Sequence, residues 1–435
     1  MKVLGIIAEY NPFHNGHLYH LNKSREITDA AYTVCVMSGN FIQRGEPAII
    51  NKWARTRMAL SAGIDLVIEL PSVYAFASAE FFAFGAVKLL DATGVVNTIC
   101  FGSESGRIDE LEQTADILKD EPPEYRGLLA EMLEKGLSFP AARAAAMEKY
   151  LSRFSSNNFD AREILASSNN ILGVEYIKAL KRLKSAITPV TIKRIGNDYN
   201  SPDIDGPVSS ATSIRNLIMK SGNCHDESLT SALPSFSAKV LEEEFAAGKG
   251  PIFPETFEKL ILALFRRMPP EQVKELPYVT EGLENRLKQA ADKSTTLSEF
   301  IDNVSTRRYT TTRIQRILFN ALSGMTSQEF AKFYQNGGPQ YIRVLGFSDA
   351  GRELLAAMKE TASLPVIIKT ANLKYLKNPL AVRMFEIENI LTDIYVLGYE
   401  NPNYRAGGQE YTQKVIMQTG ILHTPDEPGE AGNKA

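Results

Sequence analysis

The stretch His14-Asn15-Gly16-His17 carries the side chains of this sequence that are best suited to chemistry. It directly follows an apolar run, residues 3–8, which predicts a buried parallel strand, and it opens a predicted helix. A helix N-terminus at the carboxyl end of a strand offers unpaired N–H groups and a positive dipole end to an anion. Two imidazoles at positions i and i+3 share one helix face, so both can donate to phosphate oxygens. The pattern predicts a site that stabilises charge on a reacting phosphorus and a departing pyrophosphate.

Two other interpretations of these histidines remain open at this point. His20 extends the same face, so three of the five histidines in the chain lie within seven residues. Such a group is also compatible with a three-histidine zinc site or with a surface cluster that has no function. Because all three lie at the predicted ligand-binding edge of a strand, we favour phosphate binding and assign no metal ligand.

A second candidate phosphate site lies much later, at Ser209-Ser210-Ala211-Thr212-Ser213-Ile214-Arg215. Hydroxyl groups at a helix start cap the helix and can also bind phosphate. Arg215, in the first turn, would supply a planar fork for phosphate oxygens. Alone, the segment is typical of a plain helix cap. Together with the histidine motif it predicts a second set of phosphate ligands, Ser210, Thr212 and Arg215.

The elements that must position these residues alternate between strands and helices. We expect strands at 3–8, 32–37, 66–70, 96–101 and 189–195, with helices between them. This alternation predicts an α/β fold, a Rossmann-like doubly wound parallel sheet.

From about residue 221 the β-rich runs nearly vanish. We therefore expect an α/β unit at 1–225, a mainly α-helical unit at 226–423, a loop at 197–207 and a disordered tail at 424–435.

Composition excludes several classes of protein. The chain has 435 residues, a net charge of −3 and 44% hydrophobic residues, which is ordinary for a globular protein and unlike a generally basic nucleic-acid coat. No apolar run approaches the length of a membrane helix, and the N-terminus lacks the features of a signal peptide. Cys35, Cys100 and Cys224 are scattered without paired spacing, so we expect neither disulfides nor a cysteine zinc site. These features favour a cytoplasmic protein without a membrane partner or an evident obligate protein partner.

The combination strand-His-x-Gly-His-helix resembles the nucleotidylyltransferase superfamily, and the serine-rich turn before Ile214-Arg215 resembles its second signature. The likeness is closer to one family, the bacterial tRNA(Met) cytidine acetate ligases. It rests on Gly5-Ile-Ile-Ala-Glu-Tyr-Asn-Pro-Phe-His-Asn-Gly-His17, Met37-Ser-Gly-Asn-Phe-Ile-Gln-Arg-Gly-Glu-Pro-Ala48, Lys52-Trp-Ala-Arg55 and Tyr341-Ile-Arg-Val-Leu-Gly-Phe347. It spans nearly the whole chain except the last dozen residues.

The resemblance implies an ATP-dependent ligase. Such an enzyme activates acetate as acetyl-AMP, releases pyrophosphate and acetylates the exocyclic amine of the wobble cytidine of elongator tRNA(Met). It implies that the α/β unit is catalytic, with His14 and His17 acting on the phosphates, and that the helical unit helps to hold tRNA. It also implies an ATP site made of Ile7, Ala8, Glu9, Tyr10, Asn11, Pro12, Phe13, His14, Asn15, Gly16, His17, Leu18, Tyr19, His20, Gly102, Asn169 and Arg194.

The residue types at the implied positions fit this chemistry. Gly102, after a predicted strand, lets a nucleotide lie against the backbone. Asn169 is suited to an adenine or ribose edge, although a helix N-cap is an equal alternative. Arg194, at the end of a late strand, is a phosphate ligand or a surface charge. The loop 43–46 is a candidate lid or tRNA-facing loop. Magnesium could arrive with ATP, and the carboxylates considered for it are Glu9 and Asp65, neither of which we assign as a ligand.

The densest basic stretch, residues 307–316, is the candidate tRNA contact. Arg307, Arg308, Arg313 and Arg316 would follow phosphates, with the last two on one helix face, although a solvated helix end is the alternative.

Two other functions also stay open. One is a small-substrate adenylyltransferase of cofactor biosynthesis. The other is a non-enzymatic RNA-binding protein that senses nucleotide.

Overall fold

The structure is a computed structural model that describes residues 1–419 except 138, 155–158, 195–208, 223, 225 and 281. The expected loop at 197–207 and the expected tail at 424–435 lie outside the described residues. Among the described residues, no helix combines the length and apolar character needed to cross a membrane.

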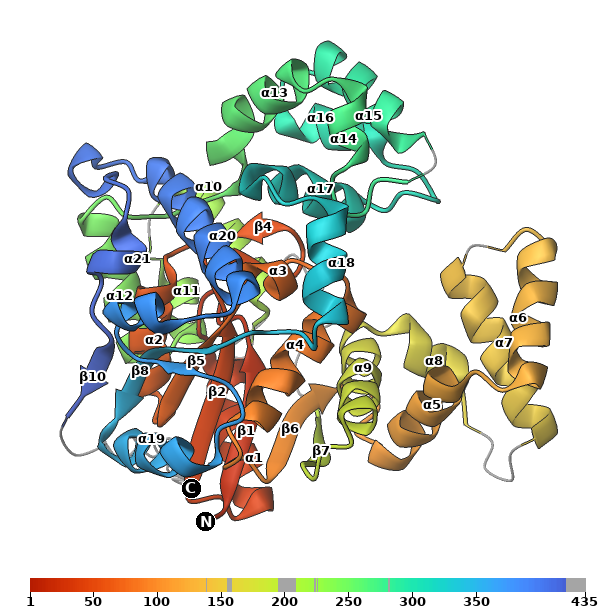
Figure 1. Cartoon of the computed structure of the whole chain (residues 1–435), viewed down its shortest axis with the longest axis horizontal. Coiled ribbons are helices and arrows are strands. Elements are labelled where there is room, and N and C mark those ends of the chain that lie inside the picture. Colours follow the sequence, from red (N-terminus) through yellow and green to blue (C-terminus); the bar gives the residue numbers. More distant parts are fainter. Residues whose placement is uncertain are drawn as a thin grey trace, which may run out of the picture.

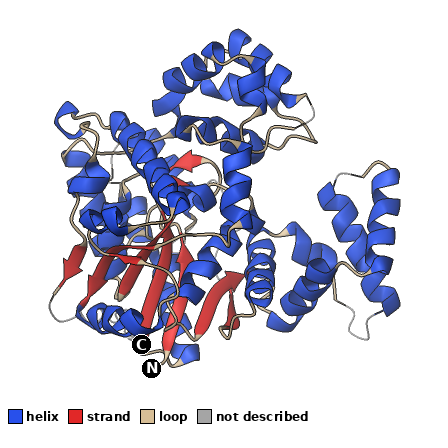
Figure 2. Ribbon diagram, in the orientation of Figure 1, coloured by secondary structure: helices blue, strands red, loops and turns tan. Residues whose placement is uncertain are grey.

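An eight-stranded sheet forms the centre of the molecule (Figures 1 and 2). Its strands, in spatial order, are β10 (Ile416–Gln418), β8 (Ile342–Ser348), β5 (Leu66–Leu70), β2 (Tyr32–Ser38), β1 (Val3–Ala8), β6 (Thr98–Ser103) and β7 (Thr188–Lys193), with β9 (Val366–Ile367) also pairing with β8. The strands from β5 to β7 are parallel. This confirms the doubly wound parallel fold expected from the alternating elements.

Helices cover both faces of the sheet, because alternate side chains of each strand point to opposite sides. Val3, Val34 and Ile68 pack in one core with the helices α4 (Ala79–Ala92), α9 (Ser168–Leu183) and α19 (Asp349–Thr361). Leu4 and Cys35 face the other core, which is shared with α1 (Asn15–Thr28), α2 (Lys52–Ser61), α10 (Ala211–Ser221) and α12 (Ser235–Ala246). Strands buried on both faces explain why their sequences read as continuous apolar runs.

The remaining helices extend the molecule beyond the sheet (Figure 1). One group lies past β7 and comprises α5 (Ile108–Asp120), α6 (Pro123–Glu134), α7 (Phe139–Phe154) and α8 (Ala161–Ala166). A second group comprises α13 (Glu258–Arg267), α14 (Pro270–Lys274), α15 (Leu283–Lys293), α16 (Leu297–Val304), α17 (Thr311–Ser323) and α18 (Ser327–Gln335). A further long helix is α20 (Pro379–Tyr395). The shorter elements are β3 (Phe41–Ile42), β4 (Glu46–Pro47), α3 (Ser72–Ala75), α11 (Glu227–Ala232), α21 (Gln409–Thr412) and 3-10 turns at Pro254–Phe257, Thr370–Tyr375, Val396–Gly398 and Pro402–Tyr404.

The segment expected to be a helical unit, 226–423, also contributes strands to the central sheet. β8 pairs with β5 in antiparallel orientation, and β9 and β10 pair with β8. The division at 225/226 therefore does not separate the sheet from the helices. The expectation failed because residues 342–348 form a single apolar strand whose partner lies 270 or more residues earlier in the chain. No local alternation of strands and helices identifies that strand as part of the sheet.

Candidate active site

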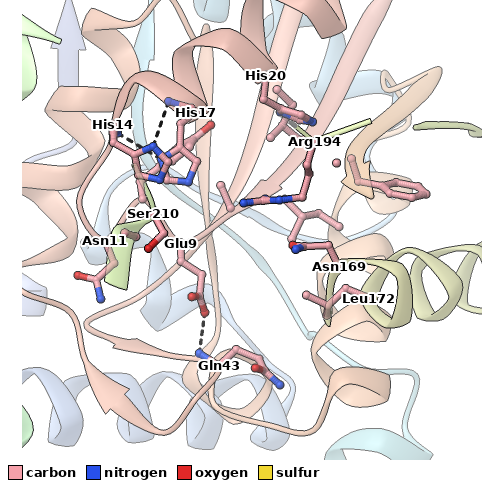
Figure 3. A pocket seen from close by; sticks show the side chains of 18 of the residues that line it. Glu9, Asn11, His14, His17, His20, Gln43, Asn169, Leu172, Arg194 and Ser210 are labelled. Carbon is pink, nitrogen blue, oxygen red and sulfur yellow. Dashed lines mark hydrogen bonds between the residues drawn. The ribbon is translucent and has the colours of Figure 1, made fainter. Parts of the chain in front are cut away.

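One cavity gathers most of the residues expected to bind ATP, and it opens at the carboxyl ends of β1, β6 and β7 (Figure 3). Ligands collect at this edge in open α/β sheets. The expected residues that line the cavity are Ile7, Ala8, Glu9, Tyr10, Asn11, His14, Gly16, His17, Tyr19, His20, Gly102, Asn169, Arg194, Ser210 and Arg215.

Five expected residues do not line the cavity. Phe13 is buried in the core below α1, and Leu18 packs against the same core. The Asn15 side chain turns away and donates to the Ser231 carbonyl at 2.8 Å. Pro12 belongs to the turn before α1, and Thr212 accepts a long contact from Arg215 at 3.5 Å. These five residues therefore pack next to the cavity without lining it.

His14 and His17 form a reciprocal cap at the start of α1. His14 is the N-cap residue, and its Nδ1 atom accepts from the Gly16 N–H at 3.1 Å. The Nδ1 atom of His17 accepts from the His14 N–H at 3.3 Å. Because each Nδ1 is an acceptor, each neutral imidazole carries its proton on Nε2. The ring centroids lie 3.8 Å apart, so the pair presents two neighbouring Nε2–H donors.

The three histidines are neutral before a ligand binds. Burial, together with the positive charges of Arg194 and Arg215, lowers the pKa of His14 to about 3. Burial also lowers the pKa of His17 well below its usual value, and it lowers the pKa of His20 to about 4. A bound polyphosphate has the opposite effect, because negative charge favours imidazolium. The site is therefore arranged to receive an anion.

His20 and Arg194 face each other across Gly102 (Figure 3). A Cβ atom on Gly102 would lie 3.1 Å from Cγ of Arg194 and 3.9 Å from Cδ2 of His20. The Nε2 atom of His20 is buried and has no hydrogen-bond partner among the described residues. A buried polar atom without a partner costs about 1–3 kcal/mol, so this nitrogen is suited to a polar atom of a ligand.

Asn169 is not the N-cap of α9, which is the role we had considered as its alternative. Ser167 occupies the cap position, and Asn169 lies inside the first turn. Its side-chain amide donates to Oε1 of Glu104 at 2.8 Å, and the Asn170 N–H donates to Oε2 of Glu104 at 2.8 Å. Glu104 thus caps α9 and fixes the Asn169 amide beside the cavity. Sequence reasoning missed Glu104, although its place directly after β6 was a usable signal.

The two motifs that were recognised in the sequence meet in space. Ser210 caps α10 by accepting from the Ser213 N–H at 3.1 Å. Arg215, one turn along the helix, donates to the Asn11 carbonyl at 2.9 Å. Its guanidinium therefore lies between the β1–α1 turn and the start of α10.

Arg55, from the Lys52–Arg55 motif, holds the strand ends from below. It is fully buried in α2 and donates to the carbonyls of Glu9 at 2.6 Å, of Ser38 at 3.1 Å and of Gly39. Four or five N–H donors in a fixed fork allow one guanidinium to satisfy several carbonyls at once. Arg55 therefore ties the ends of β1 and β2 together beneath the cavity.

Apolar side chains that the sequence did not single out close one side of the cavity. They are Phe101, Leu172, Tyr176 and Ile192. Phe101 and Ile192 each precede a predicted site residue, Gly102 or the pair Lys193–Arg194. They could have been found from the pairing of β6 with β7, which places the ends of both strands at the same edge of the sheet.

The basic stretch at 307–316 divides into two parts. Arg307 and Arg308 are exposed before α17. Arg313 and Arg316 share a helix face, but they contact the protein: Arg313 donates to the Tyr278 carbonyl at 2.8 Å, and Arg316 stacks on the Tyr278 ring. Of these four arginines, the first two are exposed and the last two are half-buried.

Neither carboxylate considered for magnesium belongs to a metal-ligand cluster. Asp65 lies before β5 and accepts from the Thr33 N–H at 2.8 Å and from the Ser348 hydroxyl at 3.0 Å. Within the described part of the chain there is no group of three or more His, Cys, Asp or Glu that could hold a metal ion.

Three features are typical of a nucleotidyl transferase. They are the parallel sheet, the paired histidines at the start of α1, and Arg215, which follows the Ser210 cap of α10. A family model described as HIGH Nucleotidyl Transferase matches residues 1–410. The tRNA(Met) cytidine acetate ligase of Acetivibrio thermocellus is 52% identical over 418 residues, which cover 96% of this chain and 100% of that protein. The corresponding ligase of Halothermothrix orenii is 44% identical, with coverage of 96% and 99%. The chain belongs to the tRNA(Met) cytidine acetate ligase family.

Solved structures agree with this assignment. The apo crystal structure of Thermotoga maritima TmcAL has a TM-score of 0.92 and 39% identity, and the match covers 97% of this chain and 100% of that one. A second crystal form of the same protein, bound with alpha-thio ATP, has a TM-score of 0.90 at the same identity.

Proposed function

We propose that this protein is an ATP-dependent, cytoplasmic ligase that joins acetate to the N4 amine of the wobble cytidine of elongator tRNA(Met). The observation that carries this proposal is the pair of neutral imidazoles at the start of α1, which direct two Nε2–H donors into a cavity bordered by Arg194 and Arg215. The names of the relatives supply the acceptor and the acyl donor.

The first step forms acetyl-AMP. An acetate oxygen attacks the α-phosphorus of ATP, the bond to the β-phosphate oxygen breaks, and pyrophosphate leaves. His14 and His17 donate hydrogen bonds to the phosphate oxygens on which negative charge grows. Arg194, directly after β7, and Arg215 of α10 add positive charge. Magnesium would arrive with the nucleotide, and we assign it no protein ligand.

The nucleoside part of ATP fits beside Gly102 and Asn169. Gly102 lets the nucleotide approach the β6 backbone, and Asn169, fixed by Glu104, offers an amide to a ribose or adenine edge. Phe101, Leu172 and Tyr176 supply an apolar wall for the base.

The tRNA is held by the helical groups outside the sheet. Arg307 and Arg308 are the exposed cations of the basic stretch, and they would contact phosphates. Arg313 and Arg316 would act indirectly, since Arg313 holds the Tyr278 backbone and Arg316 lies over the Tyr278 ring.

The test is incubation of the protein with ATP, labelled acetate and tRNA. We expect acetate-dependent release of pyrophosphate and label on tRNA as acetylcytidine. Pyrophosphate release that needs neither acetate nor RNA would instead indicate an adenylyltransferase for a small substrate. Binding of ATP without any pyrophosphate release would indicate a nucleotide sensor.

A further inference from the structure

Glu9 places a carboxylate in the cavity, where an ionised carboxylate cannot help to bind phosphate. It follows β1 directly and is largely buried. Its Oε1 atom accepts from the Gln43 N–H at 2.6 Å (Figure 3). Among the described residues, none donates to its second oxygen, Oε2, and the side chain lines the cavity. A negative charge here would repel a triphosphate. The Glu9 carboxylate is better suited to accept a hydrogen bond or a proton from a ligand N–H or O–H group.

Glu9 lies on the side of the cavity away from the proposed nucleoside site. Figure 3 shows Glu9 and Gln43 on one side of the histidine pair, and Arg194, Asn169 and Leu172 on another. Ile42 and Arg44, the chain neighbours of Gln43, also line the cavity. The reacting phosphorus, next to the histidines, would therefore lie between two compartments.

The wall of this compartment is physically joined to the basic region. Gln43 and Arg44 lie in the turn of the β3–β4 hairpin. Gly45, at φ +79°, packs so closely on α17 that a Cβ atom there would lie 2.5 Å from the Arg316 backbone nitrogen. Glu46 accepts from the Gln315 amide at 3.0 Å. The hairpin thus connects the cavity to the helix that begins beside the exposed Arg307 and Arg308.

We propose that the Glu9–Gln43–Arg44 side of the cavity is the acceptor subsite, which takes the cytosine base, and that Oε2 of Glu9 accepts the proton released by its exocyclic amine. This inference rests on the proposed function and specifies how its second step proceeds.

The chemistry balances without a further reactant. The N4 lone pair attacks the carbonyl carbon of acetyl-AMP and forms the C–N bond. The bond between that carbon and the phosphate oxygen breaks, and AMP leaves with the electron pair. One amine proton passes to Glu9 Oε2 and from there to water. The Arg44 guanidinium, which can donate through several N–H groups, is suited to the N3 and O2 acceptors of cytosine.

The charges around Glu9 set its protonation. Burial raises the pKa of the carboxyl, and the Gln43 N–H together with Arg215 on α10, Arg55 on α2 and Arg44 on the hairpin opposes that rise. A base with a raised pKa accepts a proton more readily and is still ionised when the pH exceeds that pKa. Acyl transfer should therefore fall as the pH drops through the pKa of Glu9.

The experiment separates the two steps. Acetate-dependent ATP–pyrophosphate exchange reports acetyl-AMP formation. Transfer is measured by mixing enzyme that carries labelled acetyl-AMP with tRNA in a single turnover. Glu9→Gln keeps an oxygen for the Gln43 N–H but cannot take up a proton. Glu26→Gln, the same change at an exposed residue of α1 paired with Lys23, is the matched control. Glu9→Asp restores an ionisable group.

In Glu9→Gln, the ratio of the transfer rate to the exchange rate should fall about 100-fold or more, the usual contribution of a general base. The acid limb of the transfer–pH profile should disappear in Glu9→Gln and persist in Glu9→Asp. A parallel loss of exchange and transfer, or a Glu9→Gln ratio equal to that of the control, would overturn the inference. If Glu9→Gln does not fold, a Glu9→Asp profile without an acid limb would overturn it. Absence of exchange in the unmodified protein would instead refute the proposed function.

Discussion

Replacing Lys52 by methionine tests the part of the structure that supports the site from below. Lys52 is fully buried in α2, and its Nζ atom donates to Glu69 at 2.5 Å and to Glu410. Glu410 also lies 3.4 Å from Arg343, and Glu388 adds a third buried carboxyl nearby. Methionine fills a similar volume but leaves these carboxyls without their main cation.

The expected loss can be worked from these contacts. Two hydrogen bonds to a charged group contribute about 1.5–3 kcal/mol each, or about 3–6 kcal/mol together. Removal of one partner from a buried ion pair typically costs about 3–5 kcal/mol. We therefore expect Lys52→Met to lower the free energy of unfolding by about 3–5 kcal/mol, a large fraction of the total stability of most proteins.

The loss should depend on pH in a defined direction. Burial already raises the folded-state pKa of Glu69, whereas burial raises the pKa of Glu410 but Lys52, with Arg343, holds it below its usual value. Without Lys52, we expect the folded-state pKa of Glu69 to rise further and that of Glu410 to rise above its unfolded value. A carboxyl with a raised folded pKa favours folding at low pH and loses that contribution as the pH rises through the folded pKa. For each additional proton held by the folded state, stability changes by about 1.4 kcal/mol per pH unit. The loss should thus be larger at pH 8.5 than at pH 6.

The assay is urea unfolding followed by circular dichroism and by the fluorescence of Trp53, the single tryptophan. The unmodified protein must be measured at each pH, because burial and the neighbouring Glu69 raise the pKa of Glu388 to about 8. Lys88→Met, at a half-buried lysine 3.9 Å from Asp91, is the control. A loss below about 1 kcal/mol, or an equal loss at both pH values, would refute the reasoning.

Three further outcomes are expected at the site. His14→Asn keeps a helix cap but removes an Nε2–H donor, so acetate-dependent exchange should fall about 100- to 1,000-fold, and an unchanged rate would exclude His14 from the phosphate chemistry. Gly45→Val should displace the β3–β4 hairpin from Arg316 and lower tRNA acetylation by about 10-fold more than exchange; equal effects would contradict the hairpin's role. Arg307→Ala with Arg308→Ala should reduce the slope of log Kd for tRNA against log salt by about 1–2, and an identical slope would remove both from the interface.

The sequence was sufficient for the elements near the histidine motif. β1, β2 and β5 are each mainly apolar runs bounded by a helix or turn, and the alternation of strands with helices predicts a parallel sheet. The motif at residues 14–17 could be placed at the sheet edge because it follows such a run without a gap. The meeting of Arg215 with Asn11 also follows, since both lie at carboxyl ends of the same sheet.

The rest depends on contacts between distant parts of the chain. β8 pairs with β5 across hundreds of residues, and nothing in residues 342–348 specifies that partner. Lys52 and Arg55 read locally as ordinary polar residues of a helix, because their burial is set by Glu410 and by the strand ends. Arg313 and Arg316 lie on one face as expected, but the sequence does not show that Tyr278 covers it.

β8 and Glu410 come late in the chain but pack against β5 and Lys52, which come early, and this has a consequence for biosynthesis. A ribosome that has made only the first 225 residues has produced the histidine motif and Glu69, but neither the strand that covers the β5 edge nor Glu410, the second acid paired with Lys52. The contacts that support the nucleotide site from below are therefore complete only when almost the entire polypeptide has been made. Under the proposed function, the helices proposed to hold the RNA are thus made before the support of the site is complete.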